Sequence, residues 1–246
     1  MRAPTSLLLP VLSLSIALAA PIAAPAQELT EDAIKQLALE AILENPEIVM
    51  EAVAILQARD AAAAEAQAEA TLSENRAILE NDPNAPVIGN PEGSVTVVEF
   101  FDYNCGFCRR AGPEIEALLA NDTDVRLVYR EWPILSEGSV FGARAALAAR
   151  EQGKYAQMHE ALMTSGARVD ETTVMQIAVE LGLDAEKLRI DMESDAVNEH
   201  LATSRQLADS LGFTGTPSFV IGETRVPGFV EVDRLQAIVD ETRSDG

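Results

Sequence analysis

The sequence contains few of the residues from which metal and aromatic sites are built. Among its 246 residues are two cysteines and two histidines, and aromatic residues make up 4% of the chain. A structural zinc site with four Cys or His ligands would use all of these side chains, so the composition argues against one. Hydrophobic residues nevertheless make up 48% of the chain. That content is typical of a folded core and not of a disordered polymer.

Positive charge is scarce as well. The chain has 18 Lys and Arg residues against 40 Asp and Glu residues, which gives a formal net charge of −22. A surface this acidic repels phosphate backbones and anionic membrane surfaces, so nucleic acid is excluded as a general partner. We expect the acidic excess to form a solvated surface that keeps the protein soluble.

Residues 1–26 have the pattern of a secretory signal peptide. Arg2 supplies a basic start, residues 7–20 are almost wholly apolar, and residues 24–26 read Ala-Pro-Ala, the small-x-small pattern of a cleavage site. The apolar stretch is shorter than the ~20 residues that a membrane-spanning helix needs. We predict cleavage after about Ala26 and export to the periplasm, where disulfides persist. The alternative is a buried N-terminal helix.

Residues 27–81 are predicted to form a helical arm and linker. Thr30 is a suitable N-cap, and Asn45-Pro46 predicts a break after which the helix restarts. Residues 61–70 hold seven alanines, which favour helix but offer little to bury, so they resemble a semi-rigid spacer. We expect the arm to join copies of the chain into a dimer or trimer; the alternative is that it folds back on its own domain. Apolar residues at helical spacing supply the expected contact surface: Ile34, Leu37, Ala38, Ala41, Ile42, Val49, Ala52, Val53 and Leu56.

Residues 82–246 are predicted to form the main α/β domain. A turn-rich segment at 82–93 marks its start, and strands are expected at 95–101, 125–129, 217–221 and 224–226. Helices are expected at 109–120 and 232–243, and a helical insertion at about 138–211. The predicted order is β-α-β, helical insertion, then β-β-α.

The strongest chemical signal is Cys105-Gly106-Phe107-Cys108, which follows a predicted buried strand and opens a predicted helix. Residues three apart in a first helical turn share one face, at a separation that allows a disulfide. Cys105 lies at the helix N-terminus, where free N–H groups and the helix dipole stabilise a thiolate. Since the thiolate is the species that attacks disulfides, Cys105 is the predicted nucleophile and Cys108 the resolving thiol.

Two other interpretations of the cysteine pair remain. An inert structural disulfide would close a very small loop and contribute little unfolded-state entropy. A partial zinc site would need His159 and His200, whose positions have no ligand-like spacing. We expect both histidines to be surface residues of helices.

Two segments resemble those of one protein family. Residues 100–108, Phe-Phe-Asp-Tyr-Asn-Cys-Gly-Phe-Cys, resemble the active-site segment of periplasmic oxidoreductases of the DsbA superfamily. Residues 215–220, Gly-Thr-Pro-Ser-Phe-Val, resemble the cis-proline loop of the same family. The resemblance extends over roughly residues 82–243, and the arm is similar to the N-terminal oligomerisation arm of ScsC-like members. It implies an α/β thioredoxin fold with a helical insertion (DsbA-like), preceded by an N-terminal helical arm.

The resemblance also implies a set of roles. The Cys105–Cys108 pair would act as a redox-active disulfide with no metal and no other cofactor. The loop at Thr216 and Pro217 would have a cis peptide bond and dock the substrate. Glu99, six residues before Cys105, would be buried beneath the site as a proton relay; the alternative is a strand residue facing solvent.

Two positions depart from the DsbA pattern. Phe107 stands where DsbA has histidine, and Thr216 stands where DsbA has valine before the cis-proline. Gly106-Phe107 between the cysteines and Thr216 both resemble the isomerase DsbC. The sequence hypothesis is therefore an exported, isomerase-like thiol–disulfide oxidoreductase, acting on unfolded or misoxidised secreted proteins with a membrane redox partner. The alternatives are a DsbA-type dithiol oxidase, a Cu(I)-binding protein with the same two thiolates, and a structural protein without redox activity.

Overall fold

The computed structural model describes residues 30–245. The predicted signal peptide therefore lies outside the described residues. Within residues 30–245, no helix is long and apolar enough to cross a membrane. The chain divides into two compact units, Met1–Leu56 and Gln57–Gly246.

The first unit is helical. Helix α1 spans Glu31–Glu44, and Thr30 caps it by accepting a hydrogen bond from the Ala33 N–H at 3.3 Å, as predicted. Helix α2 spans Glu47–Asn81, so the predicted break at Asn45-Pro46 is confirmed. No residue of α1 is buried. The exposed large hydrophobic residues of this unit are Ile34, Leu37, Leu39, Ile42, Leu43, Ile48, Val49, Met50, Val53, Ile55 and Leu56.

The second unit begins inside α2. Ala68, Leu72 and Leu79 are buried, and the two leucines pack in one core cluster with Val98 and Phe100. The domain therefore begins before Asp82, where the sequence placed its boundary. Leu72 and Leu79 are seven residues apart, so they share one face of the helix and turn it toward the sheet. The sequence did not predict the contact between this helix and the sheet, because only a few large apolar residues follow the alanine-rich segment.

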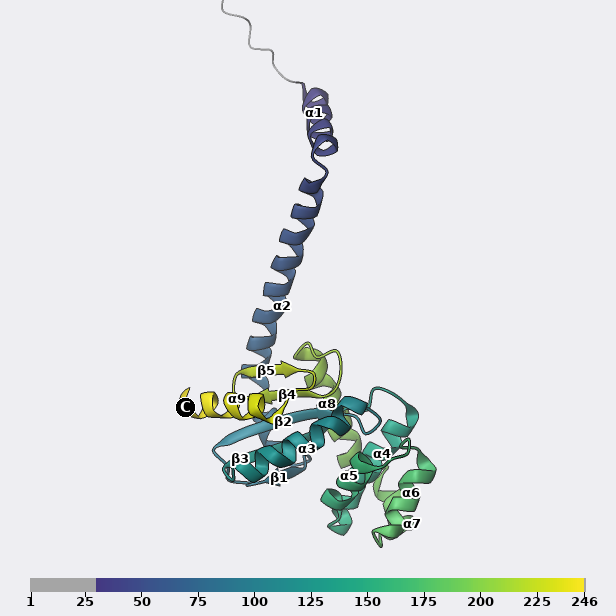
Figure 1. Cartoon of the computed structure of the whole chain (residues 1–246). Helices are drawn as coiled ribbons and strands as arrows, with labels where there is room; N and C mark the ends of the chain where they lie inside the picture. The colour runs from purple at the N-terminus through teal and green to yellow at the C-terminus, as the bar shows by residue number, and fades with distance from the viewer. Residues whose placement is uncertain (1–29, 246) are drawn as a thin grey trace, which may run out of the picture. The chain divides into compact units, whose positions relative to one another are not determined.

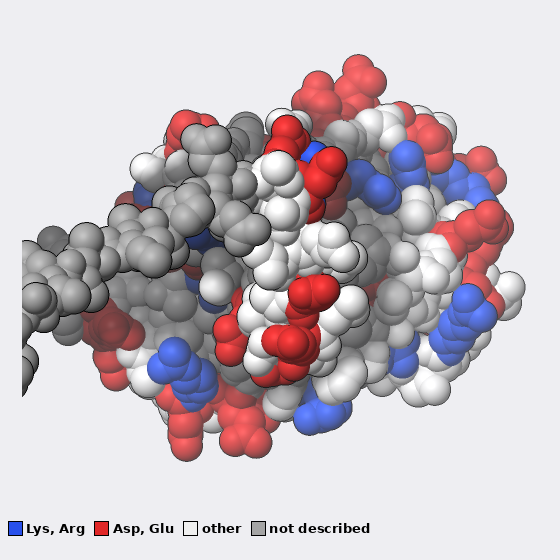
Figure 2. All heavy atoms as spheres, turned by 90° about the horizontal axis from the view of Figure 1, so that it is seen from above, with Lys and Arg blue, Asp and Glu red and all other residues white. Residues whose placement is uncertain are grey.

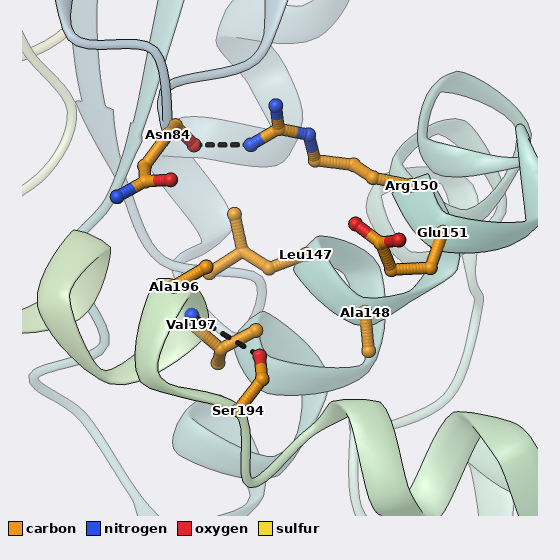
Figure 3. Close-up of a pocket in the computed structure, with 8 residues that line it drawn as sticks. All are labelled: Asn84, Leu147, Ala148, Arg150, Glu151, Ser194, Ala196 and Val197. Carbon is orange, nitrogen blue, oxygen red and sulfur yellow. Dashed lines mark hydrogen bonds between the residues drawn. The ribbon is translucent and has the colours of Figure 1, made fainter.

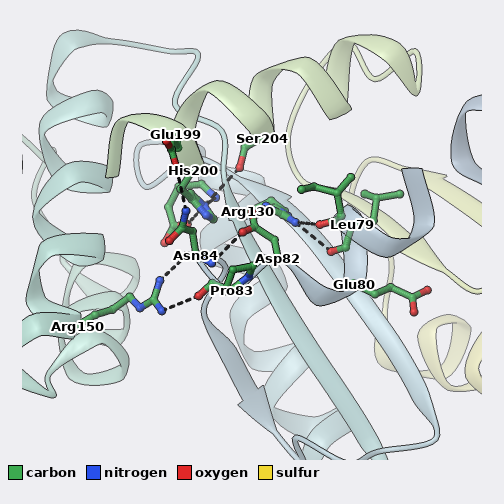
Figure 4. Close-up of polar contacts among 12 residues, drawn as sticks. Leu79, Glu80, Asp82, Pro83, Asn84, Arg130, Arg150, Glu199, His200 and Ser204 are labelled. Carbon is green, nitrogen blue, oxygen red and sulfur yellow. Dashed lines mark hydrogen bonds and ion pairs between the residues drawn. The ribbon is translucent and has the colours of Figure 1, made fainter. Parts of the chain in front are cut away.

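Arg130 fixes the end of α2 to the sheet. Its side chain is fully buried and donates to the Asp82 carboxylate at 2.5 Å. The same guanidinium donates to the main-chain carbonyls of Ile78 and Leu79, as Figure 4 shows for Leu79. Those carbonyls belong to the last turn of the helix, where carbonyl groups have no hydrogen-bond donor within the helix. Burial acts to raise the pKa of Asp82, but hydrogen bonding and the charge of Arg130 hold it below its usual value.

The sheet has five strands in the order β1-β3-β2-β4-β5. Strands β2 and β3 are parallel, and every other pair is antiparallel. The sequence predicted four of these strands but not β1, because three residues are too few to show an alternating pattern. The strands are β1 (Val87–Gly89), β2 (Val95–Phe101), β3 (Val125–Glu131), β4 (Ser218–Ile221) and β5 (Thr224–Pro227).

Helices cover both faces of the sheet (Figure 1). Helices α3 (Gly106–Asn121) and α9 (Val232–Asp245) pack on one face with the larger core cluster, and α8 (Asp195–Ser210) packs with the end of α2 on the other. The predicted helical insertion corresponds to α4 through α8, so the chain follows the predicted order. The other insertion elements are α4 (Glu137–Ala148), the 3-10 helix η1 (Ala149–Gln152), α5 (Tyr155–Thr164), α6 (Glu171–Glu180) and α7 (Ala185–Asp191).

The insertion is also tied to the segment that follows α2. Arg150 of η1 donates to the main-chain carbonyls of Pro83 and Asn84. Figure 3 shows the Arg150 side chain extending to Asn84 above a small cavity, with Leu147 and Val197 on its apolar wall. This contact joins segments 66 residues apart in the sequence.

Charged side chains are spread over the surface of the domain. Figure 2 shows acidic side chains distributed across one face, with basic side chains interspersed among them.

Candidate active site

The two cysteines lie at the start of α3. Cys105 is the N-cap residue, with φ −78° and ψ 116°, and its carbonyl accepts from the Arg109 N–H at 3.1 Å. Cys108 lies in the first turn and is fully buried, whereas Cys105 is 8% exposed. The strand–cysteine–helix arrangement predicted from the sequence is therefore present.

The two thiols have opposite pKa shifts. Hydrogen bonding by Cys108 lowers the pKa of Cys105 to about 5; burial opposes this change, and the Thr216 side chain and the N–H groups of Cys108 and Phe107 support it. The pKa of Cys108 is raised, first by burial, then by its hydrogen bond to Cys105 and by the charge of Glu99. At neutral pH the pair is therefore a thiolate at Cys105 and a fully buried thiol at Cys108.

The Thr216–Pro217 loop faces the reactive sulfur. The peptide bond between these residues is cis, as the sequence resemblance implied. The Cys105 sulfur lies 3.2 Å from the Thr216 main-chain carbonyl oxygen, to which the thiol donates when Cys105 is protonated. The Pro217 carbonyl accepts from the Gly228 N–H at 2.9 Å, and Ser218 begins strand β4, which pairs with β2. The sheet thus holds the loop against the cysteine segment.

Glu99 is buried in the sheet, as predicted. It is 1% exposed and lies in register between Tyr129 of β3 and Phe219 of β4. Burial, followed by the charges of Cys105 and Glu131, raises the pKa of Glu99 to about 8. Neither of its carboxyl oxygens has a hydrogen-bond partner among the described residues. The group is therefore free to take up or release a proton near neutral pH.

Asp102 and Asn104 shape the segment before the cysteines. The Asp102 carboxylate accepts from the Asn104 N–H at 2.7 Å and from the N–H groups of Ile134 and Leu135 at 2.8 and 3.0 Å. The Asn104 side chain donates to the Val169 carbonyl at 2.9 Å and accepts from the Val169 N–H at 2.9 Å. Sequence reasoning missed both anchors, although the spacing Asp-Tyr-Asn is typical of an Asx turn.

Phe107 projects from the active-site dipeptide to the surface. Its side chain is 56% exposed, and Gly106 has no neighbouring atoms where a side chain would begin. The Arg110 guanidinium lies 5.3 Å from the Phe107 ring centroid and 4.5 Å from that of Phe229. Arg110 thus joins the exposed Phe107 ring to Phe229.

Comparison with known families identifies the domain. The family model of the DSBA-like thioredoxin domain matches residues 96–240. That range contains both cysteines, the cis-proline loop and Glu99, and it covers more than half of the chain. The chain belongs to the DSBA-like thioredoxin domain family. The predicted thioredoxin fold with a helical insertion is confirmed.

Solved structures of similar proteins agree with this assignment. A thioredoxin-like oxidoreductase from Silicibacter pomeroyi is 61% identical, with a TM-score of 0.68, over 69% of this chain and 98% of that one. A linker-deletion mutant of Proteus mirabilis ScsC is 26% identical, with a TM-score of 0.68, over 91% of this chain and 100% of that one. The thiol–disulfide exchange protein α-DsbA2 from Wolbachia pipientis is 28% identical, with a TM-score of 0.66, over 73% of this chain and 97% of that one.

The segment before the DSBA-like domain matches a second family. The model described as the copper resistance protein ScsC N-terminal domain matches residues 31–63. This range contains α1, the break at Asn45-Pro46 and the first half of α2. The resemblance of the arm to ScsC-like proteins, first seen in the sequence, is confirmed.

Curated relatives include longer proteins. A Na(+)/H(+) antiporter NhaA 3 from Salinispora tropica is 31% identical over 161 residues, which is 64% of this chain and 25% of that protein. The chain thus spans about a quarter of the length of the curated relatives it matches.

The DSBA-like domain also contains buried polar residues that the sequence did not reveal. Glu131, at the end of β3, lies against His200 of α8, with 2.6 Å between Oε2 and Nε2. Tyr155 of α5 donates to the other Glu131 oxygen at 2.6 Å. The expectation that His200 lies on the surface is wrong, because α8 turns this position toward the end of β3.

His159 is not a free surface residue either. It is half-buried, its ring stacks on Tyr129 with 4.3 Å between centroids, and its Nδ1 lies 3.1 Å from the Tyr103 hydroxyl oxygen. Burial lowers the pKa of His159 to about 4, so this histidine is neutral at pH 7. Both histidines are taken into the domain because α5 and α8 pack against the sheet, a contact that helical periodicity alone did not specify.

Proposed function

We propose that this protein is an exported thiol–disulfide oxidoreductase that acts mainly as an isomerase on secreted proteins in the periplasm. The observation that carries the proposal is the opposite pKa shift of Cys105 and Cys108 beside the carbonyl of the cis Thr216–Pro217 bond. Disulfide exchange requires three parts: a nucleophilic thiolate, a resolving thiol and a backbone segment that binds the substrate peptide.

In the first step, the Cys105 thiolate attacks one sulfur of a substrate disulfide. A Cys105–substrate bond forms, the substrate S–S bond breaks, and the second substrate sulfur leaves as a thiolate. The thiolate fraction of Cys105 is high at neutral pH because its pKa is about 5. The substrate backbone is docked along the Thr216–Pro217 loop, next to the sulfur.

The mixed disulfide then has two outcomes. A substrate thiolate that attacks the substrate sulfur of the mixed disulfide forms a new substrate disulfide and releases the Cys105 thiolate, which is net isomerisation. Alternatively, Cys108 transfers its proton to the Glu99 carboxylate and attacks Cys105, which releases the substrate as a thiolate and leaves a Cys105–Cys108 disulfide. Once Cys105 is in the mixed disulfide, its negative charge no longer raises the pKa of Glu99, so the pKa falls and a larger fraction of Glu99 is ionised and able to accept that proton.

The N-terminal arm supports the isomerase assignment. The arm matches the ScsC N-terminal domain and exposes a series of large apolar side chains. Exposed patches of this kind mark interaction surfaces. We propose that the arm joins two or three copies into a homo-oligomer, so that a substrate held by one Cys105 meets a second one at high effective concentration.

A truncation at the end of the first unit tests this proposal. Deleting residues 27–56 removes the exposed apolar series and leaves the buried Leu72 and Leu79 in place. We expect the truncated protein to be a monomer that still reduces insulin but no longer isomerises a scrambled-disulfide substrate. The control is the full mature chain assayed at equal active-site concentration. A monomeric full-length protein in light scattering, or full isomerase activity after truncation, would contradict the proposal.

Two alternatives are distinguished by further measurements. A dithiol oxidase would be reoxidised by a membrane redox partner and would form disulfides in a reduced substrate faster than it isomerises them. The second alternative follows from the copper resistance named for the matching N-terminal family. Two thiolates favour the soft ion Cu(I), so a binding protein would retain Cu(I) stoichiometrically and show no insulin reduction.

A further inference from the structure

The Glu131–His200 pair is buried in the domain, as Cys108 is. Both side chains are at most 1% exposed, and His200 is also 3.3 Å from the Ser204 hydroxyl, as Figure 4 shows. The Glu131 main-chain N–H donates to His200 Nε2 at 3.3 Å. The Tyr155 hydroxyl donates to one Glu131 carboxyl oxygen, and His200 Nε2 lies 2.6 Å from the other. These two contacts hold the Glu131 carboxylate in one position.

Glu131 and Glu99 lie on the same face of the sheet. Strands β2 and β3 are parallel, with Glu99 opposite Tyr129 and Phe101 opposite Glu131. Side chains two residues apart on a strand share a face, so both carboxyl groups face the larger core cluster. The residues opposite the two carboxyl groups are Tyr129, which faces Glu99, and Phe101, which faces Glu131. Both of these aromatic side chains are buried. A charge acts more strongly through such surroundings than through water.

We propose that Glu131 and His200 are positioning residues for the proton that Cys108 gives up. The Glu131 carboxylate, held by Tyr155 and His200, places a negative charge on the sheet face that Glu99 occupies, and this charge keeps Glu99 basic enough to accept the proton. The inference rests on the proposed thiol–disulfide exchange at Cys105 and Cys108, to which it adds a source for the basicity of Glu99.

The direction of the pKa shifts agrees with this geometry. After burial and the charge of Cys105, the charge of Glu131 is the third influence that raises the pKa of Glu99. Burial also acts to raise the pKa of Glu131, but the charge and hydrogen bonding of His200 and the hydrogen bond of Tyr155 hold it below its usual value. The low pKa of Glu131 thus favours its ionised form, whereas the raised pKa of Glu99 places its titration near neutral pH.

Other ionisable groups surround Glu99, and none of them replaces Glu131. The tyrosines near Glu99 have raised pKa values and stay neutral, as does His159. Besides Glu131, the Cys105 thiolate is the negative charge that raises the pKa of Glu99. This thiolate charge is lost when Cys105 forms the mixed disulfide. The ionisable groups around this face are Cys105, Cys108 and Glu116 at α3, Tyr103 in the preceding loop, Tyr129 and Glu131 of β3, Tyr155 and His159 of α5, and His200 of α8.

A carboxyl-carbon NMR titration of the reduced protein tests the proposal. The Glu99 resonance is assigned by its absence in Glu99→Gln. In Glu131→Gln, which keeps the shape and removes the charge, we expect the Glu99 midpoint to fall by about one pH unit, a tenfold loss of proton affinity. The control is Glu186→Gln, which removes one negative charge from an exposed position of α7 and should leave the Glu99 midpoint unchanged.

The same variants give a kinetic readout. Because a less basic Glu99 accepts the Cys108 proton less readily, Glu131→Gln should slow the closing of the Cys105–Cys108 disulfide about tenfold in the pH range where Glu99 titrates. Attack by Cys105 should keep its rate. An unchanged Glu99 midpoint in a folded Glu131→Gln protein overturns the proposal.

A second variant covers the case in which Glu131→Gln does not fold. Replacing a buried ion pair as a unit by apolar residues is tolerated better than breaking it, so Glu131→Leu with His200→Leu removes the charge and its partner together. The Glu99 midpoint should again fall; an unchanged midpoint in this variant also overturns the proposal. Absence of insulin reduction by the wild-type protein together with a shifted midpoint would refute the proposed function and leave the coupling of Glu131 to Glu99 standing.

Discussion

The Cys105 sulfur lies 3.2 Å from the main-chain carbonyl oxygen of Thr216, a residue 111 positions away in the sequence. The acceptor belongs to the backbone, so this contact is kept whichever side chain occupies position 216. The Thr216 side chain adds a separate influence, because its hydrogen bonding lowers the pKa of Cys105. The two contributions of the loop are therefore separable by mutation.

Replacing Thr216 by valine should raise the pKa of Cys105 above about 5 and slow the release of mixed disulfides. Valine keeps the shape of threonine and loses its hydroxyl group, whereas the backbone carbonyl stays in place. Ultraviolet absorbance of the thiolate measures the pKa, and turnover of a scrambled-disulfide substrate measures release. Thr216→Ser, which retains a hydroxyl, is the matched control and should resemble the wild type. Identical titrations of the valine and serine variants would remove the Thr216 hydroxyl from the mechanism.

Introducing histidine at Phe107 should lower the pKa of Cys105 and make the cysteine pair more oxidising. A histidine beside the sulfur donates a hydrogen bond and carries positive charge, and both favour the thiolate. The wild-type reduction potential should lie between about −120 and −270 mV, the values of a strong oxidant and of thioredoxin. Equilibration with glutathione measures it. Phe107→Leu removes the exposed ring without adding a donor, and an equal shift in that variant would refute the explanation.

Glu99→Gln should stabilise the reduced protein progressively as the pH rises from about 4.5 to 8. The folded protein holds the Glu99 proton up to about pH 8, whereas the unfolded chain releases it near 4.5. In this range the folded state binds more protons, so the stability that Glu99 contributes falls as the pH rises. The substitution removes this loss, on the order of a few kcal/mol at pH 8.

Cys105 makes the opposite contribution to the dependence of folding stability on pH. Its folded pKa of about 5 lies below the unfolded value of 9, so its thiolate adds stability that is present above pH 9 and lost as the pH falls toward 5. The stability of Glu99→Gln should therefore rise with pH between 5 and 8, whereas that of the wild type stays nearly level. Urea unfolding of both proteins at several pH values decides the matter; parallel curves would show that Glu99 does not titrate in this range.

Leu72→Ala should destabilise the domain by about 2 to 5 kcal/mol, the usual cost of a cavity at a buried leucine. Leu72 is 1% exposed and packs against the sheet although it belongs to the helix that continues from the arm. The matched substitution is Leu43→Ala in α1, where the leucine is 70% exposed. That variant should leave the unfolding of the DSBA-like domain unchanged. Equal stability of the two variants would place α2 outside the core.

The sequence by itself predicted the arrangement of the redox motif. Alternating and apolar runs located β2 and β3, and the spacing Cys105-Gly106-Phe107-Cys108 after a strand located the start of α3. These features were predictable because they depend on neighbours within a few residues: strand pattern, helix capping and the reach of two side chains in one turn. The cis-proline loop and the burial of Glu99 were predicted through the family resemblance and the apolar run around Glu99.

The tertiary structure alone decided which distant residues complete the domain. Leu72 follows an alanine-rich helix and becomes core because Arg130 and the sheet hold that helix end. His200 stands on a helix whose pattern gives no sign of a partner, yet α8 packs so that it meets Glu131. Such pairings depend on how elements far apart in the chain pack together, and a buried charge is tolerated only where that packing supplies its partner. Local sequence patterns do not contain this information.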